Sequence, residues 1–170
     1  MNLDRLAPKI ARRDKAAFGE LYEETRRLVF AVCLGIVKDR GVAEEVMQET
    51  FVTVWTETPK FRGHGYKTWI LTVAKNKSIN TLRKRKRETP FDFLENENVG
   101  GGYSLDLDTG IVLRTALETL SDTDRQIVLL RNEGVKAKEI ATIVGLPRGT
   151  VSWRYAEALK KLKQTLEGKR

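Results

Sequence analysis

Cysteine, histidine and long apolar runs are nearly absent from this chain of 170 residues. Its single Cys allows no intrachain disulfide and no cysteine-based zinc site, and its single His allows no paired-histidine metal motif. No apolar stretch approaches the roughly 18 residues of a membrane helix, and the N-terminal segment lacks the apolar core of a signal peptide. These absences exclude a secreted scaffold, a transporter and most metalloenzymes. They predict a soluble, cytoplasmic protein that needs no metal or other cofactor.

Acidic residues are too few to balance the basic ones. The chain has 31 Lys and Arg against 23 Asp and Glu, which gives a formal net charge of +8. Such an excess favours a polyanionic partner, either nucleic acid or an acidic membrane surface.

Proline is also scarce, and the apolar pattern between the four prolines is helical. Apolar residues recur at three- and four-residue steps, and no segment shows the alternation of a strand. Residues 89–110 differ, because they hold Pro90, three consecutive glycines and five acidic residues without a helical period. We therefore expect an all-α protein with two small helical domains, 1–88 and 111–170, joined by a flexible linker at 89–110. The clearest helical segments of the first domain are 18–36, 42–57 and 68–87.

The spacing of Ala141, Gly145 and Val151 is typical of a helix-turn-helix. A small residue lets the second helix cross the first closely, Gly145 supplies a positive φ, and Val151 fills the angle between the helices. Ser121 is expected to cap an earlier helix, and Pro147 suits the first position of the second helix. The plain alternative is an ordinary helical hairpin with a solvated basic face.

The first turns of that second helix carry residue types that read DNA. Recognition helices place cations and hydroxyls against base edges and phosphates in the major groove. The candidates for this contact are Arg148, Thr150, Ser152, Trp153 and Arg154.

In the N-terminal half, an acidic helix precedes a basic one. The segment 42–57 places Glu45, Gln48 and Glu49 on one face and contains no Lys or Arg. In a basic protein this pattern predicts docking to a basic partner, and a merely solvated face explains it equally well.

Residues 60–87 reverse the sign of the charge. They contain ten basic residues and no acidic one, with Phe61, Tyr66 and Trp69 interleaved. Aromatic rings stack on unpaired bases and cations follow phosphates, so the segment fits melted DNA better than intact duplex. The glycine-rich loop 62–65 would let the backbone approach a base. The alternative is that Trp69, in phase with the apolar face, packs in the core, or does so with one ring face only.

Taken together, these segments resemble the σ70 family of bacterial RNA polymerase initiation factors, in its small extracytoplasmic-function (ECF) group. Residues 43–55 are similar to region 2.2 of that family. Phe61-Arg62-Gly63, Thr68-Trp69-Ile70, Ala74-Lys75-Asn76 and Asn80 are similar to regions 2.3 and 2.4, and Leu120-Ser121, Glu139-Ile140-Ala141 and residues 145–152 to region 4.

The resemblance implies a protein that is not an enzyme but binds core RNA polymerase and directs promoter recognition, DNA opening and transcription initiation. It implies docking of Glu45, Gln48 and Glu49 on the β′ clamp helices and contact of the C-terminal domain with the β flap. It implies that the C-terminal candidates bind the −35 element. The residues implied for the −10 element are Phe61, Arg62, Trp69, Lys75, Asn76, Asn80 and Arg83.

The resemblance also implies an inhibitory anti-σ partner and a linker that threads the polymerase. The acidic residues of that linker either mimic RNA in a basic channel or belong to a plain tether.

Two other functions compete when the residues alone are considered. An autonomous helix-turn-helix regulator would use 111–170 for operator DNA and 1–88 for dimerisation or sensing, but it leaves the aromatic and basic helix unexplained. A nucleic-acid-modifying enzyme is disfavoured, because the sequence has no Walker A motif and no metal cluster, and His64 is isolated in a glycine-rich loop. Cys33, in phase with apolar neighbours, is expected to be a buried small hydrophobe.

Overall fold

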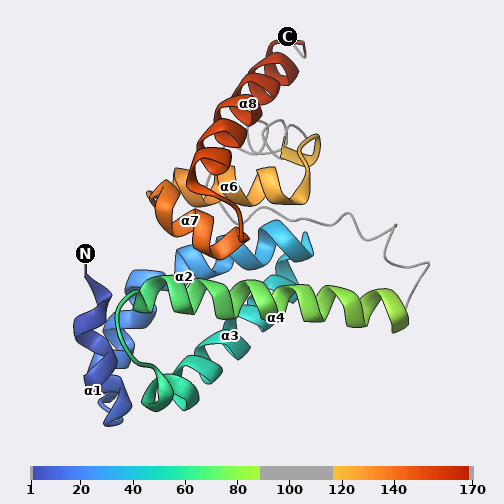
Figure 1. Cartoon of the computed structure of the whole chain (residues 1–170). Helices are drawn as coiled ribbons and strands as arrows, with labels where there is room; N and C mark the ends of the chain where they lie inside the picture. Colours follow the sequence, from blue (N-terminus) through green and yellow to red (C-terminus); the bar gives the residue numbers. More distant parts are fainter. Residues whose placement is uncertain (1, 89–116, 169–170) are drawn as a thin grey trace. The chain divides into compact units, whose positions relative to one another are not determined.

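The computed structural model describes residues 2–88 and 117–168 and divides the chain into two compact units (Figure 1). Within those residues every regular element is a helix, which confirms the all-α prediction. The predicted linker, 89–110, lies outside the described residues. The N-terminal unit contains η1 (Leu3–Leu6), α1 (Ala7–Ala11), α2 (Lys15–Val37), α3 (Arg40–Glu57), η2 (Thr58–Lys60) and α4 (Tyr66–Glu88), and the C-terminal unit contains α6 (Asp122–Asn132), α7 (Ala137–Val144) and α8 (Arg148–Glu167).

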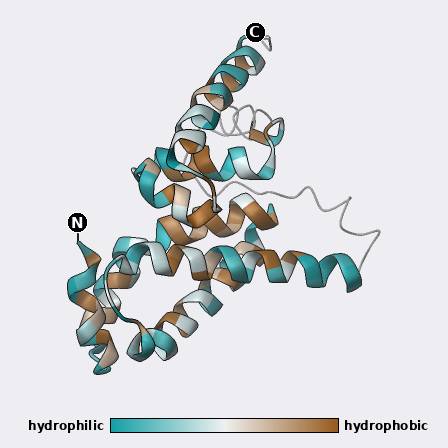
Figure 2. Cartoon of the chain, in the orientation of Figure 1, coloured by the Kyte–Doolittle hydropathy of each residue, from teal (hydrophilic) through white to brown (hydrophobic). Residues whose placement is uncertain are grey.

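Helices α2, α3 and α4 pack against one another and form the core of the N-terminal unit. Leu21 and Val29 of α2, Val54 of α3 and Ile70 of α4 are fully buried in this unit. Burying each such side chain stabilises the fold by about 1.5–3 kcal/mol relative to leaving it exposed. Figure 2 shows that α4 becomes hydrophilic toward its C-terminal end, where the basic residues follow one another.

Cys33 lies in this core and is fully buried, as its phase predicts. Burial raises the pKa of its thiol to about 11, and a hydrogen bond with Ser78 partly opposes that rise. The side chain therefore remains a thiol at neutral pH and behaves as a small hydrophobe.

Side-chain caps fix where three of the described α-helices begin. A cap satisfies one of the backbone donors that a helix start leaves without an intrahelical partner. The cap of α6 by Ser121 was expected, and the cap of α3 by Asp39 makes that helix begin at Arg40, two residues earlier than predicted. The bonds run from Ala17 N to Asp14 Oδ1 (3.1 Å), from Val42 N to Asp39 Oδ1 (3.0 Å) and from Asp124 N to Ser121 Oγ (3.2 Å).

Helices α7 and α8 form the predicted helix-turn-helix. Gly145 ends α7 with a φ of 75° and donates its N–H to the carbonyl of Ala141 at 2.9 Å. Val151 is fully buried beneath the turn. Pro147 is the N-cap of α8 and not its first residue, because its ψ of 148° is extended.

No helix in the described part of the chain is both long enough and apolar enough to cross a membrane.

Candidate functional site

The exposed face of α3 brings together the three residues predicted to dock a partner. Glu45, Gln48 and Glu49 are all exposed and lie within one stripe of the helix. Glu44, the neighbouring acid, is turned toward Arg40 in an ion pair of 3.3 Å. The stripe is therefore a distinct acidic surface on a basic protein.

Val52 extends this stripe and was missed in the sequence analysis. It lies four residues after Gln48 and three after Glu49, and 66% of it is exposed. Beside it, α2 and α3 leave a shallow apolar groove of about 360 Å³. An apolar residue within an otherwise polar face was the signal that could have revealed it. The groove is lined by Lys15, Phe18, Phe51, Val52 and Trp55.

Three aromatic rings cluster where η2 leads into α4. The ring of Trp69 stacks on that of Tyr66 with centroids 5.7 Å apart and planes at 12°. Phe61 lies 5.1 Å from Tyr66 and 5.4 Å from Trp69. We call Phe61, Tyr66 and Trp69 the aromatic cluster.

Tyr66 is the anchor of this cluster and not a surface ring. It is fully buried, and its hydroxyl lies 2.7 Å from that of Thr58. Burial raises the pKa of the Tyr66 hydroxyl, which therefore stays protonated at neutral pH. Phe61 and Trp69 are half-buried. Of the alternatives for Trp69, the structure shows the one in which a single ring face packs, here against Tyr66, and part of the ring stays exposed.

Helix α4 carries the polar −10 candidates away from the cluster along one line. Asn76, Asn80 and Arg83 are exposed and follow Trp69 at steps of seven, four and three residues, which keeps them on one stripe. Lys75 does not share it, because six residues place it roughly 120° around the helix from Trp69. The structure thus brings together four of the five α4 candidates.

The loop between η2 and α4 is held from a distance. Gly63 and Gly65 have φ values of 95° and 82°, which favour glycine. The Arg62 guanidinium folds back and donates to the carbonyls of Pro59 (2.6 Å) and Phe61 (2.9 Å). Asp4, 62 residues before Tyr66, accepts the Tyr66 N–H at 2.8 Å. No local pattern in the sequence could have revealed that contact.

In the C-terminal unit, α8 presents most of its candidates at its N-terminal end. Arg148 and Ser152 are exposed, Thr150 is half-buried, and 64% of Trp153 is exposed. Trp153 is flanked one turn away by the small exposed residues Gly149 and Ala156, so the indole is open to a partner. The arrangement presents two hydroxyls, one cation and one large ring.

Arg154 is engaged inside the unit. Its guanidinium pairs with Asp124 of α6 at 3.1 Å, and its side chain is only 35% exposed. The contact ties the first turn of α6 to α8, so Arg154 helps to orient α8.

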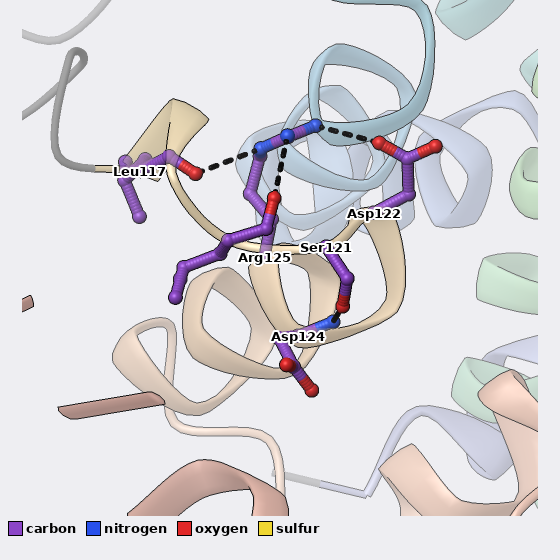
Figure 3. A network of polar contacts seen from close by, with 6 residues as sticks. Leu117, Ser121, Asp122, Asp124 and Arg125 are labelled. Carbon is purple, nitrogen blue, oxygen red and sulfur yellow. Dashed lines mark hydrogen bonds and ion pairs between the residues drawn. The ribbon is translucent and has the colours of Figure 1, made fainter. Parts of the chain in front are cut away.

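A buried arginine, also missed in the sequence analysis, organises the start of α6 (Figure 3). The side chain of Arg125 is 7% exposed and pairs with Asp122 at 3.2 Å. It also donates to the carbonyls of Leu117 (3.3 Å) and Leu120 (3.2 Å). Only the cap signal of the neighbouring Ser121 hinted at structure in this segment.

Two family models match this chain, one in each unit. The model of Sigma-70 region 2 matches residues 21–88, and that of Sigma-70 region 4 matches residues 111–162. Together they cover more than half of the chain, in the order expected from the residues.

Relatives along nearly the whole chain carry the same description. The chain is 27% identical to the "ECF RNA polymerase sigma factor SigK" of Mycobacterium tuberculosis strain H37Rv, over 98% of this chain and 94% of that protein. It is 25% identical to the SigK of Mycobacterium ulcerans, with the same coverage.

Two solved structures share the fold. One is CnrH in complex with the cytosolic domain of CnrY, with a TM-score of 0.71, 21% identity and 97% coverage of both chains. The other is the sigma factor RpoE of Bartonella quintana in complex with the anti-sigma factor NepR, with a TM-score of 0.70 and 24% identity. It covers 90% of this chain and 98% of that one.

Proposed function

Because the chain belongs to the sigma-70 family, as an RNA polymerase sigma factor of the ECF group, we propose that its surfaces divide promoter recognition between them. The exposed face of α3 docks on polymerase, the aromatic cluster and α4 bind and open the −10 element, and α8 reads the −35 element. The observation that carries this proposal is the stripe of α4. It runs unbroken from half-buried rings through two amides to the basic end of the helix.

Docking on polymerase is supported by charge and by shape. The three polar residues of the α3 stripe can form ion pairs and hydrogen bonds with basic side chains of a partner. Val52 and the adjoining groove offer an apolar contact. Interfaces of this kind combine a buried apolar centre with a polar rim. The partner surface is a basic one on core polymerase, with the β′ clamp helices as the expected element.

Opening of the −10 element is supported by the half-buried rings. A flipped or unpaired base needs a ring to stack on, and stacking contributes about 1–3 kcal/mol per base. Phe61 and Trp69 present partly exposed rings that the buried Tyr66 holds in place. Asn76, Asn80 and Arg83 continue toward neighbouring bases and phosphates, and Lys75 approaches the backbone from the side of the helix.

Reading of the −35 element is assigned to Arg148, Thr150, Ser152 and Trp153. Arg148 and the hydroxyls suit base edges and phosphates. Arg154 acts through its pair with Asp124 and keeps α8 at a fixed angle to α6.

A third partner is an anti-sigma factor. Support comes from RpoE, which was solved with the anti-sigma factor NepR and shares this fold. Such a partner would act by covering the surfaces that polymerase and DNA need.

The proposal is tested first by gel filtration of the purified protein with bacterial core polymerase in the absence of DNA. We expect co-elution at one to one. Elution of a dimer that shifts duplex DNA without polymerase would contradict it and favour an autonomous regulator.

Replacing Trp69 by alanine tests the −10 surface. We expect promoter opening by the holoenzyme to slow about tenfold, because one base loses its stacking partner, while binding to closed duplex changes less than twofold. Opening is measured by 2-aminopurine fluorescence within the −10 element. The Trp69→Phe variant keeps a ring and should retain most of the activity. Loss of helical circular dichroism in the alanine variant would instead mark Trp69 as a core residue.

Replacing thymine by deoxyuridine in the −35 element tests Trp153. An exposed indole in the major groove is suited to the thymine methyl, and removing one buried methyl costs about 0.8 kcal/mol, or roughly fourfold in affinity. We expect that loss at one thymine for the wild-type holoenzyme and no loss for Trp153→Ala. Equal sensitivity in both proteins would rule out the methyl contact.

A further inference from the structure

Asp4 of η1 reaches across the N-terminal unit to the start of α4. Its Oδ1 accepts the N–H of Tyr66 at 2.8 Å, and its Oδ2 accepts the N–H of Gly65 at 3.3 Å. His64 Nδ1 lies 3.8 Å from the same Oδ2. The Asp4 side chain is 27% exposed, so it is largely buried against the start of α4, where these two backbone N–H groups are its partners.

This contact replaces a cap that α4 cannot make for itself. Gly65, the residue before the helix, accepts the N–H of Trp69 through its carbonyl but has no side chain to cap the free donors. Helices α2, α3 and α6 use their own Asp or Ser for that purpose. Helix α4 takes its acceptor from a segment 62 residues away.

The segment that carries Asp4 is itself fixed to the unit. Leu3 and Leu6 of η1 are buried, at 5% and 0% exposure. Arg5 forms an ion pair with Glu20 of α2, and Asn2 accepts the Asp4 N–H at 2.9 Å. The carboxylate is therefore presented from a defined position.

Tyr66 passes this restraint on to the aromatic cluster. Its N–H is bound by Asp4 and its hydroxyl lies against Thr58, so the residue is held at both ends. Its ring contacts both of the partly exposed rings, Phe61 and Trp69. A shift of the Tyr66 backbone would move both rings.

A direct DNA contact does not explain Asp4. A carboxylate repels phosphates, and the surrounding segment 60–87 is otherwise free of acidic residues. The Asp4 carboxylate instead accepts hydrogen bonds from two backbone N–H groups at the start of α4. Its negative charge is stabilised there by the helix dipole.

We propose that Asp4 is a positioning residue for −10 recognition, which holds the loop 62–65 and the aromatic cluster in the geometry that captures an unpaired base. The inference rests on the proposed function of the cluster. It makes the N-terminal η1 segment part of the −10 apparatus through its contacts with the start of α4 and not through a DNA contact of its own.

The test uses the full chain with core polymerase and a single-stranded −10 oligonucleotide. The oligonucleotide comes from a promoter that the wild-type holoenzyme selects from random DNA. Each position is replaced in turn by an abasic site. The dissociation constant for the abasic oligonucleotide divided by that for the intact one is the binding penalty at that position. Wild-type holoenzyme should show a penalty of about tenfold at the captured base.

In Asp4→Ala the penalty at that base should fall below about twofold, because the rings no longer form a defined pocket. Asp4→Asn keeps an amide oxygen for the Tyr66 N–H and should retain at least half of the penalty on a logarithmic scale. Asp14→Ala is the matched control, since it removes the carboxylate cap of α2 in the same unit and should leave the penalty unchanged.

Three results would overturn the inference. One is a full penalty in Asp4→Ala, and the second is an equal loss in Asp4→Ala and Asp14→Ala at equal melting temperature. The third is the absence of any abasic-sensitive position in the wild type, which would remove the proposed −10 function as well. If the penalty disappears in Trp69→Ala but persists in Asp4→Ala, the −10 function of the aromatic cluster is supported and only the positioning role of Asp4 is rejected.

Discussion

Replacing Arg125 by alanine is expected to lower the free energy of unfolding of the C-terminal unit by about 2–3 kcal/mol. The guanidinium is buried and binds the carbonyls of Leu117 and Leu120 as well as the Asp122 carboxylate (Figure 3). Alanine would leave the buried Leu120 carbonyl without this donor, which costs about 1–3 kcal/mol, and would remove the packing of the buried side-chain stem. The Leu117 carbonyl keeps the N–H of Leu120 as a donor at 3.1 Å. Arg125→Lys should recover little of the loss, because an ammonium cannot reproduce the planar fork.

Hydrogen exchange at increasing denaturant concentration measures this effect in the full chain, because it separates the peptides of α6 and α8 from those of α2 and α4. The loss should appear in the first pair only. Arg131→Ala is the control on the same helix, since its exposed guanidinium donates to Val135 at 3.3 Å and lies over Tyr155. We expect it to cost less than 1 kcal/mol. Equal costs for the two variants would show that the buried network contributes no more than a surface contact.

Local chemistry predicted the helices because each carries its own signals. In the N-terminal unit the long helices bury one apolar face, and α3 is capped by the residue just before it. Gly145 and Val151 predicted the turn between α7 and α8, since a positive φ and a buried plug are needed at those positions. Domain boundaries within 89–116 remain a prediction, because they lie outside the described residues.

Contacts between distant residues could not be predicted in the same way. Helix α4 begins at Tyr66, about two residues before the predicted start, because its cap comes from Asp4. Arg125 looks like any surface cation in the sequence, since its partners include backbone carbonyls that no residue pattern marks.

The candidate site follows the same division. The family resemblance predicted Asn76 and Asn80 as candidates, and α4 places them on one stripe, but only packing could decide between the alternatives for Trp69. Tyr66 provides that packing, because its buried ring stacks on one face of the indole.

Reversing two charges on α3, Glu45→Lys with Glu49→Lys, is expected to weaken binding to core polymerase at least 100-fold, or about 2.7 kcal/mol. Both side chains are exposed, and the variant raises the net charge by four. If the partner surface is basic, each lysine replaces an attraction by a repulsion across the interface. The dissociation constant is measured by fluorescence anisotropy of the labelled full chain at a fixed salt concentration.

The matched control applies the same change of charge elsewhere. Glu23→Lys with Glu24→Lys alters two exposed acids of α2 and also raises the net charge by four, so any general effect of charge appears equally in both proteins. We expect the control to bind within about threefold of wild type, because exposed charges away from an interface are screened by salt. Equal weakening in the two variants would mean that overall charge, and not the α3 stripe, governs affinity.

Undiminished binding of the α3 variant would move the docking surface to another face of the N-terminal unit. Because Val52 lies on the same stripe, Val52→Glu should then also bind normally, whereas a true docking face would lose its apolar anchor with that change.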